Sequence, residues 1–243
     1  MKRFYLTVWG VIFTLHTFAQ IHFDANIANN HLWRGIEVAD GVVITSDISY
    51  TMLNGHICLG FWGGSNVTGE YKEFNHHLSF RTNGFSLSFW DTYNFSSGAT
   101  YNNKEFFNYK ASETGRFLDA IIDYRFKGYF PLYVSWSTIL FGRDRNTTNQ
   151  ANKYSSFCYI EYPVYAKKGW HLDAGIGTAF ALNKAGDSSH FYGEQPGIVH
   201  ISLKLSRKIS IQGYKIPVHA CAVWNPQANQ AFWQIGAQLF SFN

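Results

Sequence analysis

Residues 117–126 read Phe-Leu-Asp-Ala-Ile-Ile-Asp-Tyr-Arg-Phe, and their pattern decides the class of fold. Every second side chain is apolar, and three of the side chains between them are charged. The apolar set is Leu118, Ala120, Ile122, Tyr124 and Phe126, and the charged set is Asp119, Asp123 and Arg125. Successive side chains of a β-strand point to opposite faces, whereas a helix repeats every 3.6 residues. The stretch therefore predicts a strand with one apolar and one polar face.

The same period of two runs through the chain beyond residue 20. It predicts twelve strands, which start near residues 22, 42, 56, 71, 85, 115, 129, 154, 170, 197, 214 and 231. Tight-turn pairs such as Asn54-Gly55 and Asn83-Gly84 alternate with longer polar connections such as 96–114. This alternation is typical of a transmembrane antiparallel β-barrel. The first hairpin is an exception, since its turn at Ala39-Asp40-Gly41 is short on the side where the other loops are long.

The composition supports an aromatic-rich sheet protein. Among the 243 residues, 19% are aromatic and only 15% are charged, against about 25% charged in a typical soluble domain. Aromatic residues at this density argue against disorder. The mean hydropathy of −0.17 excludes a bundle of transmembrane helices.

Periodicity alone does not say which face of the sheet points outward, so a soluble β-sandwich or lipocalin-like barrel stays an alternative. Three features favour the membrane barrel. The polar faces are poor in Lys and Glu, and the last strand, 233–242, is rich in aromatics. Aromatic residues also gather near the strand ends, as in interfacial girdles. They are Phe61, Trp62, Phe89, Tyr93, Phe126, Tyr129, Trp224, Phe232 and Trp233.

The first nineteen residues have the features of a secretory signal peptide. Met1-Lys2-Arg3 precedes an uncharged apolar run, and Ala19 is the predicted cleavage site. We expect residues 20–243 to form the barrel in a bacterial outer membrane, in contact with its lipid. Removal of Lys2 and Arg3 leaves 18 basic and 16 acidic side chains, a net charge of +2. This near balance gives no reason to expect a nucleic-acid partner.

The most specific stretch is Asn30-His31-Leu32-Trp33-Arg34-Gly35-Ile36, followed by Ala39-Asp40-Gly41 and the alternating residues 42–50. With Leu59-Gly60-Phe61-Trp62-Gly63-Gly64, it resembles the opening of the TorF-type porin family of Bacteroidetes-like outer membranes. The match covers residues 26–64 and implies the fold and the location rather than an activity. The last strand, with Gln234, Gly236 and Leu239, resembles the signal read by the barrel-insertion machinery. Phe240 and Phe242 are one position out of phase with that signal.

A membrane barrel with its apolar face outward has a lumen lined by the polar faces. The predicted pore-lining residues are Asp47, Glu73, His77, Arg81, Asp119, Asp123, Arg125, Glu161, Asp173, His200, Lys204 and His219. Because both signs of charge are present, we predict a weakly selective, narrow porin-like channel for small polar solutes. A twelve-stranded barrel lies between the filled small barrels and the open large ones. A plugged structural or ligand-binding barrel is therefore the alternative, and residues 96–114 are candidates for folding inward.

Signals for catalysis or cofactors are weak. His77-Leu78-Ser79 and His200-Ile201-Ser202 each place His and Ser on one strand face, as an esterase or phospholipase requires. No Gly-x-Ser-x-Gly elbow is present, and we expect no enzyme activity. Nothing suggests a nucleotide, haem or dedicated metal. Cys58, Cys158 and Cys221 have no metal-site spacing, and three small buried side chains are favoured over a disulfide.

Two residues do not fit the alternation. His76 and Asp91 fall on the predicted lipid face, where an acid near the bilayer centre costs about 2 kcal/mol or more. Either the two side chains lie at the membrane interface, or a β-bulge shifts the phase.

Overall fold

The computed structural model describes residues 20–183 and 188–242, and the predicted signal peptide lies outside this range. No helix of the described part is long and apolar enough to cross a membrane. The barrel strands are β1 (Gln20–Ala28), β4 (Val43–Met52), β5 (Ile57–Asn66), β6 (Lys72–Thr82), β7 (Phe85–Asn94), β8 (Arg116–Arg125), β9 (Tyr133–Gly142), β10 (Ser155–Lys167), β11 (Trp170–Ala181), β12 (Gly197–Ile211), β13 (Tyr214–Asn225) and β14 (Gln230–Phe242).

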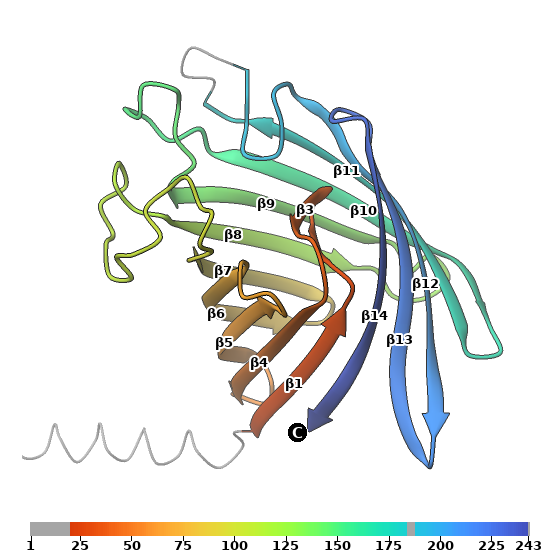
Figure 1. The fold of residues 1–243 in the computed structure, drawn as a ribbon. Helices are drawn as coiled ribbons and strands as arrows, with labels where there is room; N and C mark the ends of the chain where they lie inside the picture. The colour runs from red at the N-terminus through yellow and green to blue at the C-terminus, as the bar shows by residue number, and fades with distance from the viewer. Residues whose placement is uncertain (1–19, 184–187, 243) are drawn as a thin grey trace, which may run out of the picture.

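These twelve strands form one closed antiparallel barrel, as predicted (Figure 1). Strands from β4 to β14 pair in sequence order, and β1 closes the ring by pairing with both β14 and β4. Most strands begin within two residues of the predicted start. β9 begins four residues late, at Tyr133 rather than near 129. Pro131 explains the delay, because proline cannot donate the backbone hydrogen bond that a paired strand position needs.

The apolar faces of the strands point outward. In the stretch 117–126, Ile122 is 51% exposed, whereas Asp119 on the opposite face is 3% exposed. The exposed large side chains include one or more from nearly every strand of the wall, such as Ile48, Leu78, Ile176 and Ile235. The polar faces therefore surround the interior, which a lipocalin-like barrel in water would reverse.

The connections separate into two ends. The chain termini of the barrel and the short turns lie at one end, which we call the turn end (Figure 1). The longer connections, such as 95–115, 143–154 and the described part of the loop 182–196, lie at the loop end. This arrangement agrees with the predicted alternation of short and long connections.

The first connection corrects the sequence prediction. It is not a short turn at Ala39-Asp40-Gly41, because β1 already ends at Ala28 and pairs directly with β4. Residues 29–42 leave the wall and form a small sheet of β2 (His31–Trp33) and β3 (Ile36–Ala39), which we call the inner hairpin. Figure 1 shows β3 within the outline of the barrel.

The main buried cluster lies where the inner hairpin meets the opposite wall. Trp33 and Ile36 pack against a set of buried side chains from the wall and from the loop 182–196. This set is Phe117, Ile139, Phe157, Ala179, Tyr192 and Val199. The barrel is therefore partly filled by its own chain.

Candidate functional site: the barrel interior

The tip of the inner hairpin is fitted to the wall at Gly35. Arg34 and Gly35 have φ values of 50° and 83°, the left-handed pair that a tight hairpin turn requires. A Cβ atom on Gly35 would lie 1.9 Å from the backbone oxygen of Val199 in β12. The Asn225 side-chain amide donates a hydrogen bond to the oxygen of Gly35 at 3.0 Å. Only glycine allows this close approach, so the tip is held against β12 and β13.

Arg34 connects the hairpin to the wall by charge. Its Nη2 lies 2.6 Å from Oδ2 of Asp119 in β8, and its Nη1 donates to the Tyr192 hydroxyl at 2.6 Å. The guanidinium also lies over the rings of Trp33, Phe157 and Tyr192, 4.7–5.7 Å from their centroids. A buried ion pair with this many partners fixes the hairpin in one position.

Asp119 belongs to a row of inward-facing residues on β4–β9 that we call the waist row. Strand register places Ser49, Gly60, His77, Trp90, Asp119 and Ile139 side by side on adjacent strands. His77 stacks on Trp90 with ring centroids 4.5 Å apart, and its Nε2 lies 2.7 Å from Oδ2 of Asp47. A Cβ on Gly60 would lie 2.4 Å from His77, so the glycine leaves room for the imidazole.

Two cavities lie on either side of the waist row. The loop-end cavity, of about 650 Å³, is lined by the inner hairpin, the inner faces of β5–β8 and the loop residues Tyr101, Arg143 and Phe191. The turn-end cavity, of about 630 Å³, is lined by Arg81, Asp123, Tyr133 and the turns at 54–56 and 82–85. Both are lined by Trp90 and Ile121. The two cavities therefore meet at these side chains.

The predicted pore-lining residues face the interior, on the strand faces opposite the exposed apolar side chains. Asp47 and His77 pair in the wall, and Asp119 binds Arg34. Glu73 lines the loop-end cavity and accepts hydrogen bonds from Asn75 and Asn94. Arg81 and Asp123 line the turn-end cavity. Whether these side chains line a conducting path stays a prediction.

The remaining six predicted residues belong mostly to the other half of the wall. Arg125 lies 3.4 Å from Glu161, and Asp173 is directly opposite Lys204 in the register. His200 packs edge-on against Tyr159, and Nε2 of His219 lies 3.2 Å from the Gln234 side-chain oxygen. Three ion pairs, Asp47–His77, Asp119–Arg34 and Arg125–Glu161, thus join charges of the described interior.

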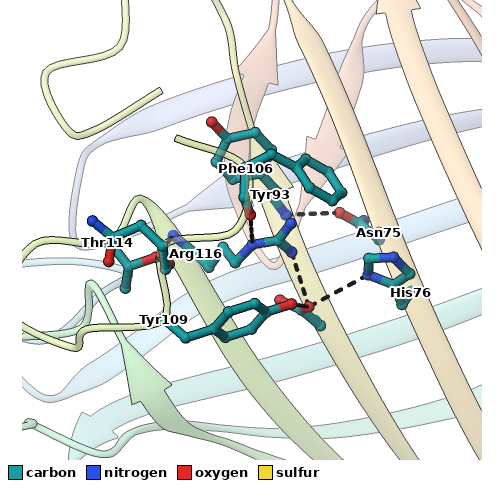
Figure 2. A network of polar contacts seen from close by, with 9 residues as sticks. Asn75, His76, Tyr93, Phe106, Tyr109, Thr114 and Arg116 are labelled. Carbon is teal, nitrogen blue, oxygen red and sulfur yellow. Dashed lines mark hydrogen bonds and ion pairs between the residues drawn. The ribbon is translucent and has the colours of Figure 1, made fainter. Parts of the chain in front are cut away.

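The structure contradicts one of the two explanations for His76 and Asp91, the β-bulge. The register between β6 and β7 is continuous, so no bulge shifts the phase there. Both side chains point outward and lie opposite each other, with His76 Nδ1 3.4 Å from Asp91 Oδ2. The same oxygen is bound by Arg116 Nη1 at 2.9 Å and by the Tyr109 hydroxyl at 2.7 Å (Figure 2).

We call His76, Asp91, Phe106, Tyr109 and Arg116 the outer cluster. Figure 2 shows the Arg116 guanidinium between Phe106 and Tyr109, with its Nε donating to the Phe106 oxygen at 2.7 Å. Arg116 is only 1% exposed although it lies on the outer face. The loop 95–115 therefore folds over the outside of β6–β8 and encloses the polar groups.

The loop 95–115 also reaches the interior, because Tyr101 lines the loop-end cavity. The prediction that this loop folds inward is thus confirmed for Tyr101, whereas Phe106 and Tyr109 pack outside. Two residues assigned to the aromatic girdle are likewise placed differently. Trp62 points into the loop-end cavity, and Tyr93 is 3% exposed because Phe106 packs on it.

Arg143 is a further interior residue with a distinctive environment. It lies between the rings of Tyr101, Phe191 and Phe117, 3.8, 5.0 and 5.3 Å from their centroids. Its Nε is buried without a hydrogen-bond partner, and no carboxylate of the described residues lies within 4.0 Å of it. Burial lowers the pKa of this guanidinium from its ordinary value and outweighs the opposing effects of Tyr101, Glu73 and Asp144.

No group of three metal-ligating side chains occurs in residues 20–183 and 188–242. The three cysteines are free, Cys58 buried and the other two half-buried. Within the described residues, no hydrogen bond joins the two members of either His-Ser pair. His77 bonds to Asp47, and Ser202 lies 3.4 Å from the Tyr159 hydroxyl.

Comparison with known proteins gives little. No protein-family model matches the chain, and no curated protein matches it, so the resemblance to TorF-type porins stays a prediction. Among solved structures, the chain is similar to an outer membrane channel from Pseudomonas putida F1. The two are 11% identical over 90% of this chain and 92% of the channel, with a TM-score of 0.43. A similarity this low carries no argument about the function of this chain.

Proposed function

We propose that the barrel spans a bacterial outer membrane. The support is the outward apolar face, where side chains such as Ile48, Ile122, Leu203 and Ile235 are about half exposed. Monomeric soluble proteins rarely expose large contiguous apolar patches, and hydrocarbon is the solvent in which such a wall is stable. Strands of 9–15 residues are long enough to cross it when tilted. Contacts with the membrane lipid and with the barrel-insertion machinery follow from this proposal.

We further propose that the barrel is a narrow channel for passive passage of small polar solutes. The observation that carries this proposal is the pair of interior cavities, one at each end, which share Trp90 and Ile121. The inner hairpin fills part of the cross-section beside them, so the passage is narrower than the wall alone would make it. Because charges of both signs face the interior, we expect weak ion selectivity.

Conductance across a planar lipid bilayer tests the channel. Folded protein, checked by its heat-dependent gel mobility, should give small discrete steps. Trp90→Ala removes a ring where the two cavities meet and should enlarge the steps. Trp136→Ala is the matched control, since Trp136 points outward and is 47% exposed. Folded protein that never conducts, with or without Trp90, would contradict the proposal.

A plugged or ligand-binding barrel is the second candidate. The buried cluster of Trp33, Phe117, Phe157 and Tyr192 favours it, because these rings pack across the interior. Folded protein that gives no conductance steps in the bilayer would support this candidate. That the chain is not an enzyme stays a prediction, and Ser79→Ala or Ser202→Ala should leave any esterase signal of the preparation unchanged.

A further inference from the structure

The charged side chains that line the loop-end cavity are not equally satisfied. Arg34 and Asp119 bind each other. Glu37 accepts a hydrogen bond from Asn30 at 2.7 Å, and Glu73 accepts from Asn75 and Asn94. Arg143 alone among these charges has no ion pair and no hydrogen bond to its guanidinium within the described residues. Its aromatic neighbours hold the group in place but accept none of its protons.

The shape of the cavity limits what can complete this site. Its volume of about 650 Å³ lies within the range of small-molecule sites, about 300–1,000 Å³. Its walls include Trp33, Trp62, Trp90 and Phe117, which present flat apolar surfaces. A guanidinium offers parallel N–H donors that match a carboxylate. The unpaired N–H groups of Arg143 and the aromatic walls together suit a carboxylate attached to an aromatic ring.

We propose that the loop-end cavity binds an aromatic monocarboxylate, with the carboxylate on Arg143 and the ring among the tryptophans. This inference deepens the proposed function and rests on it, because it treats the cavity as the mouth of the channel. Glu37 and Glu73 face the same space, but amide donors already bind one oxygen of Glu37 and both oxygens of Glu73. Arg143 is therefore the group that is left to recognise the ligand.

Binding of benzoate to the purified barrel in detergent tests the proposal, by titration calorimetry and by the fluorescence of the cavity tryptophans. Benzamide has the same ring without the charge, and benzylamine carries the opposite charge. We expect benzoate to bind at least about tenfold more tightly than either, since a hydrogen bond to a charged group is worth about 1.5 kcal/mol or more. Equal binding of benzoate and benzamide, or tighter binding of benzylamine, would overturn the proposal.

Variants of two neighbouring arginines separate recognition from stability. Arg143→Gln should weaken benzoate about tenfold and leave benzamide unchanged. Arg145→Gln is the matched control, because Arg145 lies two residues away and is fully engaged with Asn149 and Asn152. A folded Arg143→Gln protein that binds benzoate like the wild type would overturn the proposal.

The binding experiment needs no conduction, so the two proposals fail separately. Conducting protein without benzoate binding overturns the ligand site alone. Benzoate binding to a barrel that never conducts leaves the site standing and overturns the channel.

Discussion

Two buried arginine–aspartate pairs lie on opposite sides of the same wall. Arg34 and Asp119 meet inside the barrel at 2.6 Å, and Arg116 and Asp91 meet outside at 2.9 Å. Both guanidinium groups lie over aromatic rings and are nearly hidden from solvent. In each case a segment that leaves the barrel wall covers the pair. The inner hairpin covers the pair inside, and the loop 95–115 covers the pair outside.

The consequences of the two pairs differ because of what surrounds them. The inner pair fixes a segment that fills part of the barrel interior. The outer pair fixes a loop over the outer face of β6–β8. If the barrel is the membrane channel proposed above, the inner pair limits the width of its lumen and the outer pair keeps charge away from lipid.

The largest effect is expected from Arg34→Ala. The change leaves Asp119 buried without its partner, which costs about 3 kcal/mol of stability or more, and releases the hairpin tip. Conductance steps should grow, and the heat-dependent gel shift should occur at lower temperature. The double variant Arg34→Leu, Asp119→Leu should recover stability while the steps stay large. Unchanged steps in both variants would show that the hairpin does not limit the passage.

Gly35→Ala tests the seat of the same hairpin without changing a charge. The new Cβ would meet the Val199 oxygen at 1.9 Å, and such overpacking costs about 1–3 kcal/mol. Larger conductance steps are expected. Gly41→Ala is the matched control, since Gly41 has a similar φ of 78° and no atom within 4 Å of the new Cβ. If the two changes have equal effects, the loss of stability comes from backbone strain and not from the contact between Gly35 and Val199.

Tyr109→Phe removes one hydrogen bond from the outer pair and should cost about 1 kcal/mol. The loop 95–115 should then open more often, and trypsin should cleave faster at the exposed Lys104 and Lys110. Conductance should not change. Tyr129→Phe, at a fully exposed ring in a turn at the other end, serves as the control. A change in conductance would contradict the separation of the two faces.

The smallest effect is expected from acid acting through His190. Burial lowers the pKa of His190, and its Nδ1 accepts a hydrogen bond from the Tyr192 backbone N–H at 3.2 Å. Because the folded pKa is below the unfolded value of 6.5, folding suffers no penalty above pH 6.5 and loses stability as the pH falls below it. His190→Gln should flatten the dependence of the free energy of unfolding on pH below about 6.5. An unchanged pH profile would show that His190 makes no contribution.

The sequence predicted the structure well wherever apolar and polar side chains alternate along a strand. The strand pattern of 117–126 and of its counterparts predicted the twelve strands, their faces and the two ends, because side-chain alternation is local. It also placed Asp119 and His77 on the inward face. The motif around Trp33-Arg34-Gly35 was visible as unusual, but the turn was predicted at Ala39-Asp40-Gly41, because no local pattern indicates that a hairpin folds into its own barrel.

The residues that the sequence analysis missed are those that act across the interior. Trp90, Tyr192 and Arg143 belong to different segments, and no spacing connects them. The unusual pair His76 and Asp91 was the one signal of the outer cluster, yet the covering loop could not be foreseen.

The sequence by itself determined an all-β chain with an apolar and a polar face on each strand, since that depends only on neighbouring residues. The tertiary structure alone decided that the barrel closes around its own hairpin, that Arg34 pairs with Asp119 and that Arg143 has no ion pair within the described residues. These outcomes depend on which segments, far apart in the sequence, come into contact when the barrel closes. Those contacts decide which side chains lose solvent and which partners they find.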